Sequence, residues 1–83
     1  MGTTEVSHTV DSQRIRLSRD RVLAALVGVE PGPIRKHVVD VEGRIYPVKE
    51  AYALATGLDV LDFNTNQARK ALRALGFPVQ RVA

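Results

Sequence analysis

The side chains best suited to chemistry gather in one segment near the end of the chain. Arg69, Lys70 and Arg73 are spaced at i, i+1 and i+4, so a helix would project them from one side. Basic residues neutralise phosphates, and asparagine and glutamine can pair with adenine edges. The candidate contacts of this segment are Asn64, Thr65, Asn66, Gln67, Arg69, Lys70 and Arg73. We expect them to contact an anionic partner. The alternative is that the basic residues form an ordinary solvated helix face and that the polar residues only cap the helix.

A second candidate segment runs from Arg44 to Lys49, where a strand is expected to end on Tyr46 and a helix to begin directly after it. A lysine in the first turn opposes the helix dipole by about 0.3–1 kcal/mol. An anion bound near that terminus would remove the conflict, which makes Arg44, Tyr46 and Lys49 candidate contacts. The alternative is that Tyr46 belongs to the core and that Lys49 is merely solvated.

Other kinds of chemistry lack their residues. The chain has no cysteine, and its two histidines, His8 and His37, are far apart without companion ligands, so we expect no metal site. No serine stands in a pattern typical of an activated nucleophile, and the isolated glycines form no phosphate-binding loop. We therefore expect a protein that is not an enzyme and that uses no cofactor.

Apolar periodicity predicts three helices that would position these side chains. They are expected over 19–27 behind an N-cap at Ser18, over 47–56 with Pro47 as the first helical residue, and from a cap at Asn64 or Thr65 to Leu75. Gly28, Gly57 and Gly76 would end them. The predicted inward faces are Val22, Leu23, Leu26 and Val27, then Val48, Ala51, Tyr52 and Ala55, then Ala68, Ala71, Leu72 and Leu75. The apolar residues of the loop 58–64 are expected to pack inward.

Strand signals flank the helices. The clearest is a hairpin of 35–41 with 44–46 around the turn Glu42-Gly43. Residues 8–17 form either a hairpin or a single strand, and 77–82 form a final strand whose Pro78 suggests an edge position. The predicted fold class is α+β, with three helices packed on a small, mostly antiparallel sheet. Residues 8–83 would form the single domain, after a flexible stretch of 1–7.

The net charge of +3 is unevenly distributed. Residues 1–43 hold six Lys or Arg against six acids, whereas residues 44–83 hold six against three, so the whole excess lies in the second half. Such a bias is typical of a protein with an anionic partner. The absence of cysteine, of a signal sequence and of a long apolar stretch favours the cytoplasm and no membrane.

Several short motifs resemble those of a known family. The motifs are Tyr46-Pro47-Val48-Lys49, Ala55-Thr56-Gly57, Phe63-Asn64-Thr65, Ala68 and Leu72-Arg73-Ala74-Leu75-Gly76-Phe77. Over residues 34–80 they resemble the N-terminal domain of McrA-like, methylation-dependent restriction endonucleases, whose HNH nuclease part has no counterpart here. The resemblance implies binding without cleavage to DNA that carries 5-methylcytosine. Carried over by position, it points to Arg44, Tyr46, Lys49, Asn64, Thr65, Asn66, Arg69 and Arg73.

The methyl group of cytosine could be sensed by apolar contact in the major groove, or in an aromatic pocket after base flipping. Tyr46 is the best aromatic candidate for either mode, Phe63 and Phe77 are expected in the core, and Tyr52 fits both roles. We expect a partner that is double-stranded DNA, possibly methylated. The alternative is a protein-interaction module, such as a homodimer formed through the last strand or the apolar loop 58–63.

Overall fold

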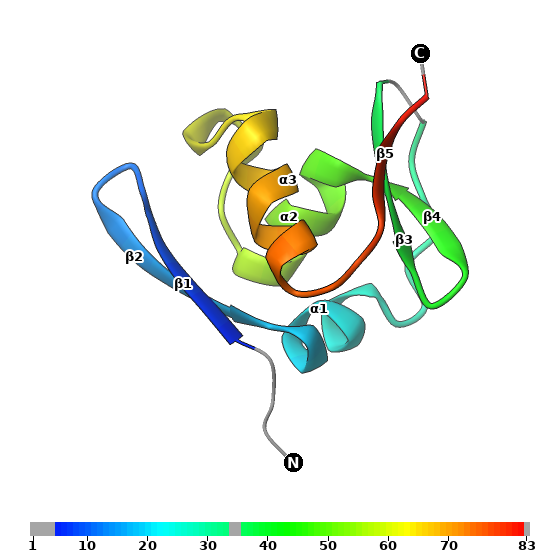
Figure 1. Ribbon diagram of the computed structural model, residues 1–83, viewed down its shortest axis with the longest axis horizontal. Coiled ribbons are helices and arrows are strands. Elements are labelled where there is room, and N and C mark those ends of the chain that lie inside the picture. The colour runs from blue at the N-terminus through cyan, green and yellow to red at the C-terminus, as the bar shows by residue number, and fades with distance from the viewer. Residues whose placement is uncertain (1–4, 34–35, 83) are drawn as a thin grey trace.

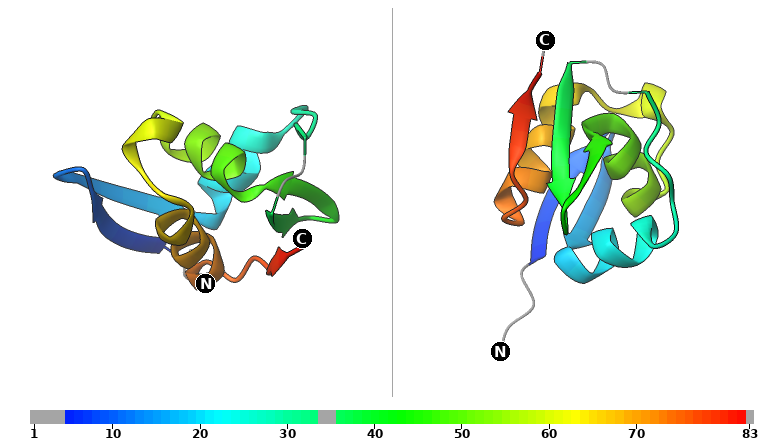
Figure 2. Two further views of the ribbon diagram at one scale, coloured as in Figure 1. Left: turned by 90° about the horizontal axis from the view of Figure 1, so that it is seen from above. Right: turned by 90° about the vertical axis from the view of Figure 1, so that its right-hand side faces the viewer.

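The computed structural model describes residues 5–33 and 36–82 and confirms the α+β class. Its helices are α1 (Arg19–Leu26), α2 (Val48–Thr56) and α3 (Thr65–Ala74), with a short 3-10 helix η1 (Val60–Asp62). Its strands are β1 (Glu5–Val10), β2 (Gln13–Ser18), β3 (His37–Val41), β4 (Arg44–Pro47) and β5 (Val79–Arg81). The strands form two antiparallel sheets, β1-β2 and β4-β3-β5, rather than the single sheet expected. The helices lie between these two sheets (Figures 1 and 2).

The N-terminal strands form a hairpin, so the first of the two alternatives predicted for residues 8–17 is confirmed and the single strand is not found. Val10 pairs with Gln13 across a turn whose Asp11 and Ser12 have φ of 49° and 67°. The first strand begins at Glu5, so residues 5–7 belong to the sheet and the expectation that they are flexible is wrong; residues 1–4 lie outside the described part. The strand pattern of β1 was hard to recognise because one of its inward-facing positions holds His8 instead of an apolar residue.

Helix α1 begins as predicted and ends one residue earlier. The Ser18 side chain accepts a hydrogen bond from the Arg21 backbone N–H at 3.1 Å. Val22 and Leu26 are buried and Leu23 is half-buried, but Val27 is 78% exposed, so its predicted place on the inward face is wrong. The reason is that Val27 already has extended backbone angles, and Gly28 with φ of 73° then turns the chain away.

The three-stranded sheet contains the hairpin predicted most clearly. β3 and β4 join through Glu42 and Gly43, with φ of 54° and 85°. The predicted strand start at Arg35 lies outside the described residues. Pro47 ends β4 and precedes α2 instead of being its first residue. β5 pairs with β3 at the edge of the sheet, as Pro78 suggested, and is shorter than predicted.

A single apolar cluster joins both sheets to the helices. The predicted inward residues of α2 and α3 are all buried there, as are Phe63 and Phe77. The loop 58–63 departs from expectation, because Val60 is 44% exposed and Leu61 88% exposed. Asp59 caps η1 by accepting a hydrogen bond from the Leu61 N–H, and the two apolar side chains of this turn stay outside. Phe63 is buried and Leu58 packs half-buried against the core, so these two residues anchor the loop. In the described part of the chain, no helix is long and apolar enough to cross a bilayer.

Candidate nucleic-acid interface

The start of α3 is closed by a capping box. The Asn64 Oδ1 accepts from the Gln67 backbone N–H at 2.8 Å, and the Gln67 Oε1 accepts from the Asn64 N–H at 2.9 Å. The sequence predicted this box from the three-residue spacing. A bidentate contact to adenine needs both the oxygen and the amide group of one side chain. Because the side-chain oxygens of Asn64 and Gln67 are engaged in the cap, neither residue is free to make this contact. We conclude that Asn64 and Gln67 position α3.

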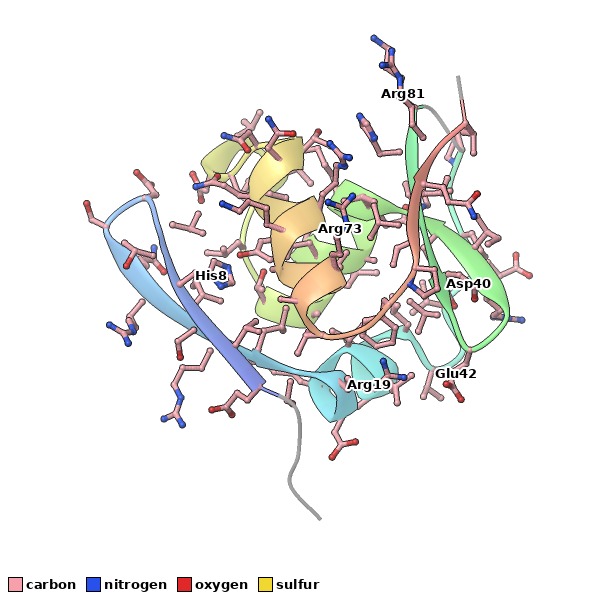
Figure 3. The ribbon with its side chains drawn as sticks, viewed as in Figure 1. His8, Arg19, Asp40, Glu42, Arg73 and Arg81 are labelled. Carbon is pink, nitrogen blue, oxygen red and sulfur yellow. The ribbon has the colours of Figure 1, made fainter. Side chains whose placement is uncertain are left out.

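The outer side of α3 carries Asn66, Arg69, Lys70 and Arg73, which we call the α3 basic face. Lys70 and Arg73 are exposed and Arg69 is half-buried. The Arg69 Nη1 donates to the Asn66 Oδ1 at 3.3 Å. No acidic residue occurs in α3, so nothing within the helix neutralises this face. Figure 3 shows Arg73 projecting from α3 on the side of β5.

Three residues that the sequence analysis did not single out extend this positive region. His37 is at the centre of this group. Burial first, and then the charges of the neighbouring Arg69, Arg81 and Lys36, lower the pKa of His37. The Val82 N–H donates to the Lys36 carbonyl at 2.8 Å, and His37 pairs with Arg81 in the sheet. Their grouping depends on the pairing of β3 with β5, which brings together residues more than forty positions apart in sequence.

Next to this region lies a groove of about 800 Å³, which we call the α2 groove. Its polar lining consists of Lys36, His37, Lys49, Glu50 and Thr65. Its apolar lining consists of Pro33, Pro47, Val48, Ala53, Leu54 and Val60. The groove therefore joins Lys49 and Thr65, which were predicted as contacts, to Lys36 and His37, which were not.

Two polar atoms in this neighbourhood have no hydrogen-bond partner. They are the Nδ1 of His37 and the Nε of Arg69, and both atoms are inaccessible to solvent. Polar atoms withdrawn from water are usually paired, so an unpaired atom calls for an explanation. His37 as a residue also lines the α2 groove.

The first turn of α2 contains its own compensation for Lys49. The Lys49 Nζ lies 5.4 Å from the centroid of the Phe63 ring, a cation–π arrangement. Glu50 follows in the same turn, where its charge suits the helix dipole. Its Oε1 accepts from the Gly32 N–H at 3.0 Å and holds residues 30–33, which we call the proline-rich loop, against the helix. An anion is therefore not required to stabilise this helix start.

Tyr46 belongs to the core. Its side chain is 1% exposed, and its hydroxyl donates to the carbonyl oxygens of Val29 at 3.1 Å and Leu26 at 3.4 Å. Stacking on a base is incompatible with this burial, so the expectation that Tyr46 is a DNA contact is corrected. Arg44 is exposed, and its Nη1 also donates to the Val29 carbonyl at 3.2 Å. Both residues fasten β4 to the end of α1.

A second groove, of about 420 Å³, separates β1 from α3 and includes Gln67 and Lys70 in its lining. His8 also lines it, and the His8 Nε2 is hydrogen-bonded to the Tyr52 hydroxyl. Burial lowers the pKa of His8 and raises the pKa of Tyr52 to about 12. Tyr52 is fully buried and packs edge-on against Phe63, with the ring centroids 4.6 Å apart. Tyr52 is thus a core residue, and His8 ties the N-terminal hairpin to α2.

Among residues 5–33 and 36–82, no group of three His, Cys, Asp or Glu side chains is arranged to hold a metal ion. In comparisons with known proteins, the family model described as SCO5918-like matches residues 10–83. No curated protein and no solved structure matches the chain. The matched region includes all of α3, the whole positive region and the whole lining of the α2 groove, whereas the β1 side of the second groove lies before it.

Proposed function

The chain belongs to the SCO5918-like family, and we propose that it binds double-stranded DNA through the α3 basic face. Lys36 and Arg81 would extend the contact along the phosphate backbone. The binding would be without catalysis, as the sequence motifs imply.

One observation carries this proposal: cations from three separate segments lie together around His37. Arg69 comes from α3, Lys36 precedes β3, and Arg81 ends β5. Lys70 and Arg73 are exposed on the same helix as Arg69. A helix that presents several basic residues and no acidic one is typical of an element that lies against DNA phosphates. Since α3 is fixed by its cap and its buried apolar side, it can dock as a preformed rod.

The proposal is tested by removing charges from this face. We expect Lys70→Ala and Arg73→Ala each to weaken binding to all duplex sequences about equally, and to reduce the slope of log K against log salt by about 0.9 for each lost phosphate contact. Both side chains are exposed, so the fold should survive. Fluorescence anisotropy over a salt series measures both quantities.

Arg21→Ala is the matched control, because Arg21 is an exposed arginine on α1 whose Nη1 donates to the Arg16 carbonyl of β2. It removes the same charge and should leave the slope unchanged. If all three variants behave alike, net charge rather than the α3 basic face governs binding, and the proposed interface is wrong.

A preference for 5-methylcytosine is the finer form of the proposal, and the motif resemblance supports it. Because Tyr46 is buried, the methyl group would have to be sensed by other residues. Leu54 and Val60 are exposed apolar side chains that line the α2 groove, and they offer apolar surface for contact with the methyl group.

A protein-interaction module is the second candidate, and the exposure of Leu61 favours it. A leucine that is 88% exposed beside the half-exposed Val60 resembles the centre of a small contact patch. β5 also leaves one edge of its sheet unpaired among the described strands. Three results together would favour this function: light scattering finds a tight dimer, Leu61→Gln disrupts that dimer, and the protein does not bind DNA.

A further inference from the structure

We propose that the α2 groove holds a single pyrimidine nucleotide extruded from the duplex, with its base against Leu54 and Val60. This inference rests on the proposed DNA binding and specifies where the modified base would be read. The occupant is a nucleotide still joined to the DNA strand.

The size of the groove suits this occupant. A volume of about 800 Å³ lies within the range of roughly 300–1,000 Å³ that is typical of small-molecule sites. A duplex is too wide to enter such a groove, whereas one nucleotide can. Base extrusion is the general means by which proteins bring a base out of a duplex and into a pocket of this kind.

The lining offers the two kinds of surface that a methylated pyrimidine presents. Leu54 and Val60 are 45% and 44% exposed, so they can take up apolar contact with the ring and with a methyl group at C5. On the polar side, Thr65 and His37 belong to the lining and can offer a hydroxyl and an imidazole to the base edge.

The cations at the groove are placed to hold the backbone of such a nucleotide. Lys36 and Lys49 belong to the lining and can neutralise its phosphates. Thr65 is the first residue of α3, and Arg69, one turn further along, lies close enough to His37 to act on its pKa. A strand that follows the α3 basic face would therefore pass the mouth of the groove.

The wall formed by the proline-rich loop is held in place. The Glu50 carboxylate accepts from the Gly32 N–H, and a Cβ at position 32 would lie 2.5 Å from the Glu50 Oε2. A larger residue at position 32 would have to displace the end of the Glu50 side chain from this contact, so glycine suits the contact that keeps Pro33 at the groove. A preformed wall limits the ordering that binding would require.

The test uses duplexes that differ only in the residue opposite one 5-methylcytosine: guanine or an abasic site. Extrusion is less costly for a base without a pairing partner, by a few kcal/mol. We expect the wild-type protein to bind the abasic duplex at least about tenfold more tightly, since 1.4 kcal/mol corresponds to that factor. Anisotropy competition measures the ratio of the two affinities.

Leu54→Gln should abolish this ratio while general DNA binding remains, because glutamine keeps the helix propensity of α2 but removes the apolar wall. Leu61→Gln is the control, since Leu61 neighbours Val60 on η1 and does not line the groove. Val60→Thr serves in place of Leu54→Gln if the latter fails to fold, as judged by circular dichroism.

The outcomes separate the inference from the function on which it rests. A wild-type ratio near one, with salt-sensitive binding intact, would overturn extrusion and leave DNA binding standing. A tenfold ratio that Leu54→Gln retains would overturn the groove as the site. No binding to either duplex at low salt would overturn both proposals.

Discussion

Tyr46 shows how a residue in a recognisable motif can serve the core. It is followed by Pro47, Val48 and Lys49, a sequence that suggests an exposed aromatic residue at an anion site. In the structure its ring is buried and its hydroxyl reaches the carbonyl of Val29, at the end of the α1 region. The neighbouring Ile45 is 39% exposed, as strand alternation requires when Tyr46 faces inward.

We therefore predict that Tyr46→Phe lowers the free energy of unfolding by about 1 kcal/mol, the typical contribution of one hydrogen bond, and leaves DNA affinity unchanged. Urea denaturation measures the first quantity and anisotropy the second. A variant of full stability that loses discrimination between methylated and unmethylated duplexes would contradict the assignment of Tyr46 to the core.

His8 provides a prediction about pH. Burial lowers the pKa of His8 in the folded protein, whereas in the unfolded chain this pKa is about 6.5. As the pH falls through that value, the unfolded state binds the proton first, so the free energy of unfolding decreases until the folded-state pKa is also passed. His37 has the same direction of shift and contributes likewise.

The contribution of His8 is isolated by His8→Gln, which keeps a polar group beside the Tyr52 hydroxyl. We expect the melting temperature of the wild type to fall more than that of the variant between pH 7.5 and 5, as followed by circular dichroism. Equal falls in both proteins would show that the contact of His8 with Tyr52 is not sensitive to protonation.

At the scale of elements, α3 was the most predictable part of the candidate site. Its cap, its buried side and its basic side follow from local spacing alone, because a helix determines which residues share a face. The loop 58–63 was not predictable in this way. Its apolar composition suggested burial throughout, but a three-residue 3-10 turn capped by Asp59 leaves Val60 and Leu61 outside, and only the two ends of the loop, Leu58 and Phe63, pack against the core.

Arg19 illustrates a related limit. It adds to the positive charge of the sequence, yet its Nη1 donates to the Leu75 carbonyl at 3.0 Å and its guanidinium lies 4.3 Å from the Phe77 ring centroid. It thereby holds the end of α3 against α1. Only the packing of the two helices shows that this cation has a structural role.

The capping box leads to a prediction about α3 as a unit. We expect Asn64→Ala to lower the free energy of unfolding by about 1 kcal/mol, within the range measured for N-cap replacements. Because the cap acts by fixing the helix, DNA affinity should fall only modestly and the salt slope should stay unchanged. A loss of one phosphate contact from the slope would instead make Asn64 a direct contact.

At the scale of the whole molecule, the fold class and most strands and helices were predictable, whereas the division into two sheets was not. The pairing of strands depends on long-range contacts, and no local sequence pattern predicted that β1 and β2 would form a sheet separate from β4-β3-β5. The same contacts bring Lys36 and Arg81 to Arg69 and form the α2 groove. The helical part of the candidate site could thus be predicted from sequence, and the groove could not.

The central claim is that this positive region binds double-stranded DNA. The most direct measurement is the anisotropy of labelled duplexes, identical except for cytosine methylation, titrated with the wild-type protein at several salt concentrations. We predict binding whose log K falls linearly with log salt, with a methylation preference that persists as salt rises. The absence of binding to either duplex at low salt would contradict the claim.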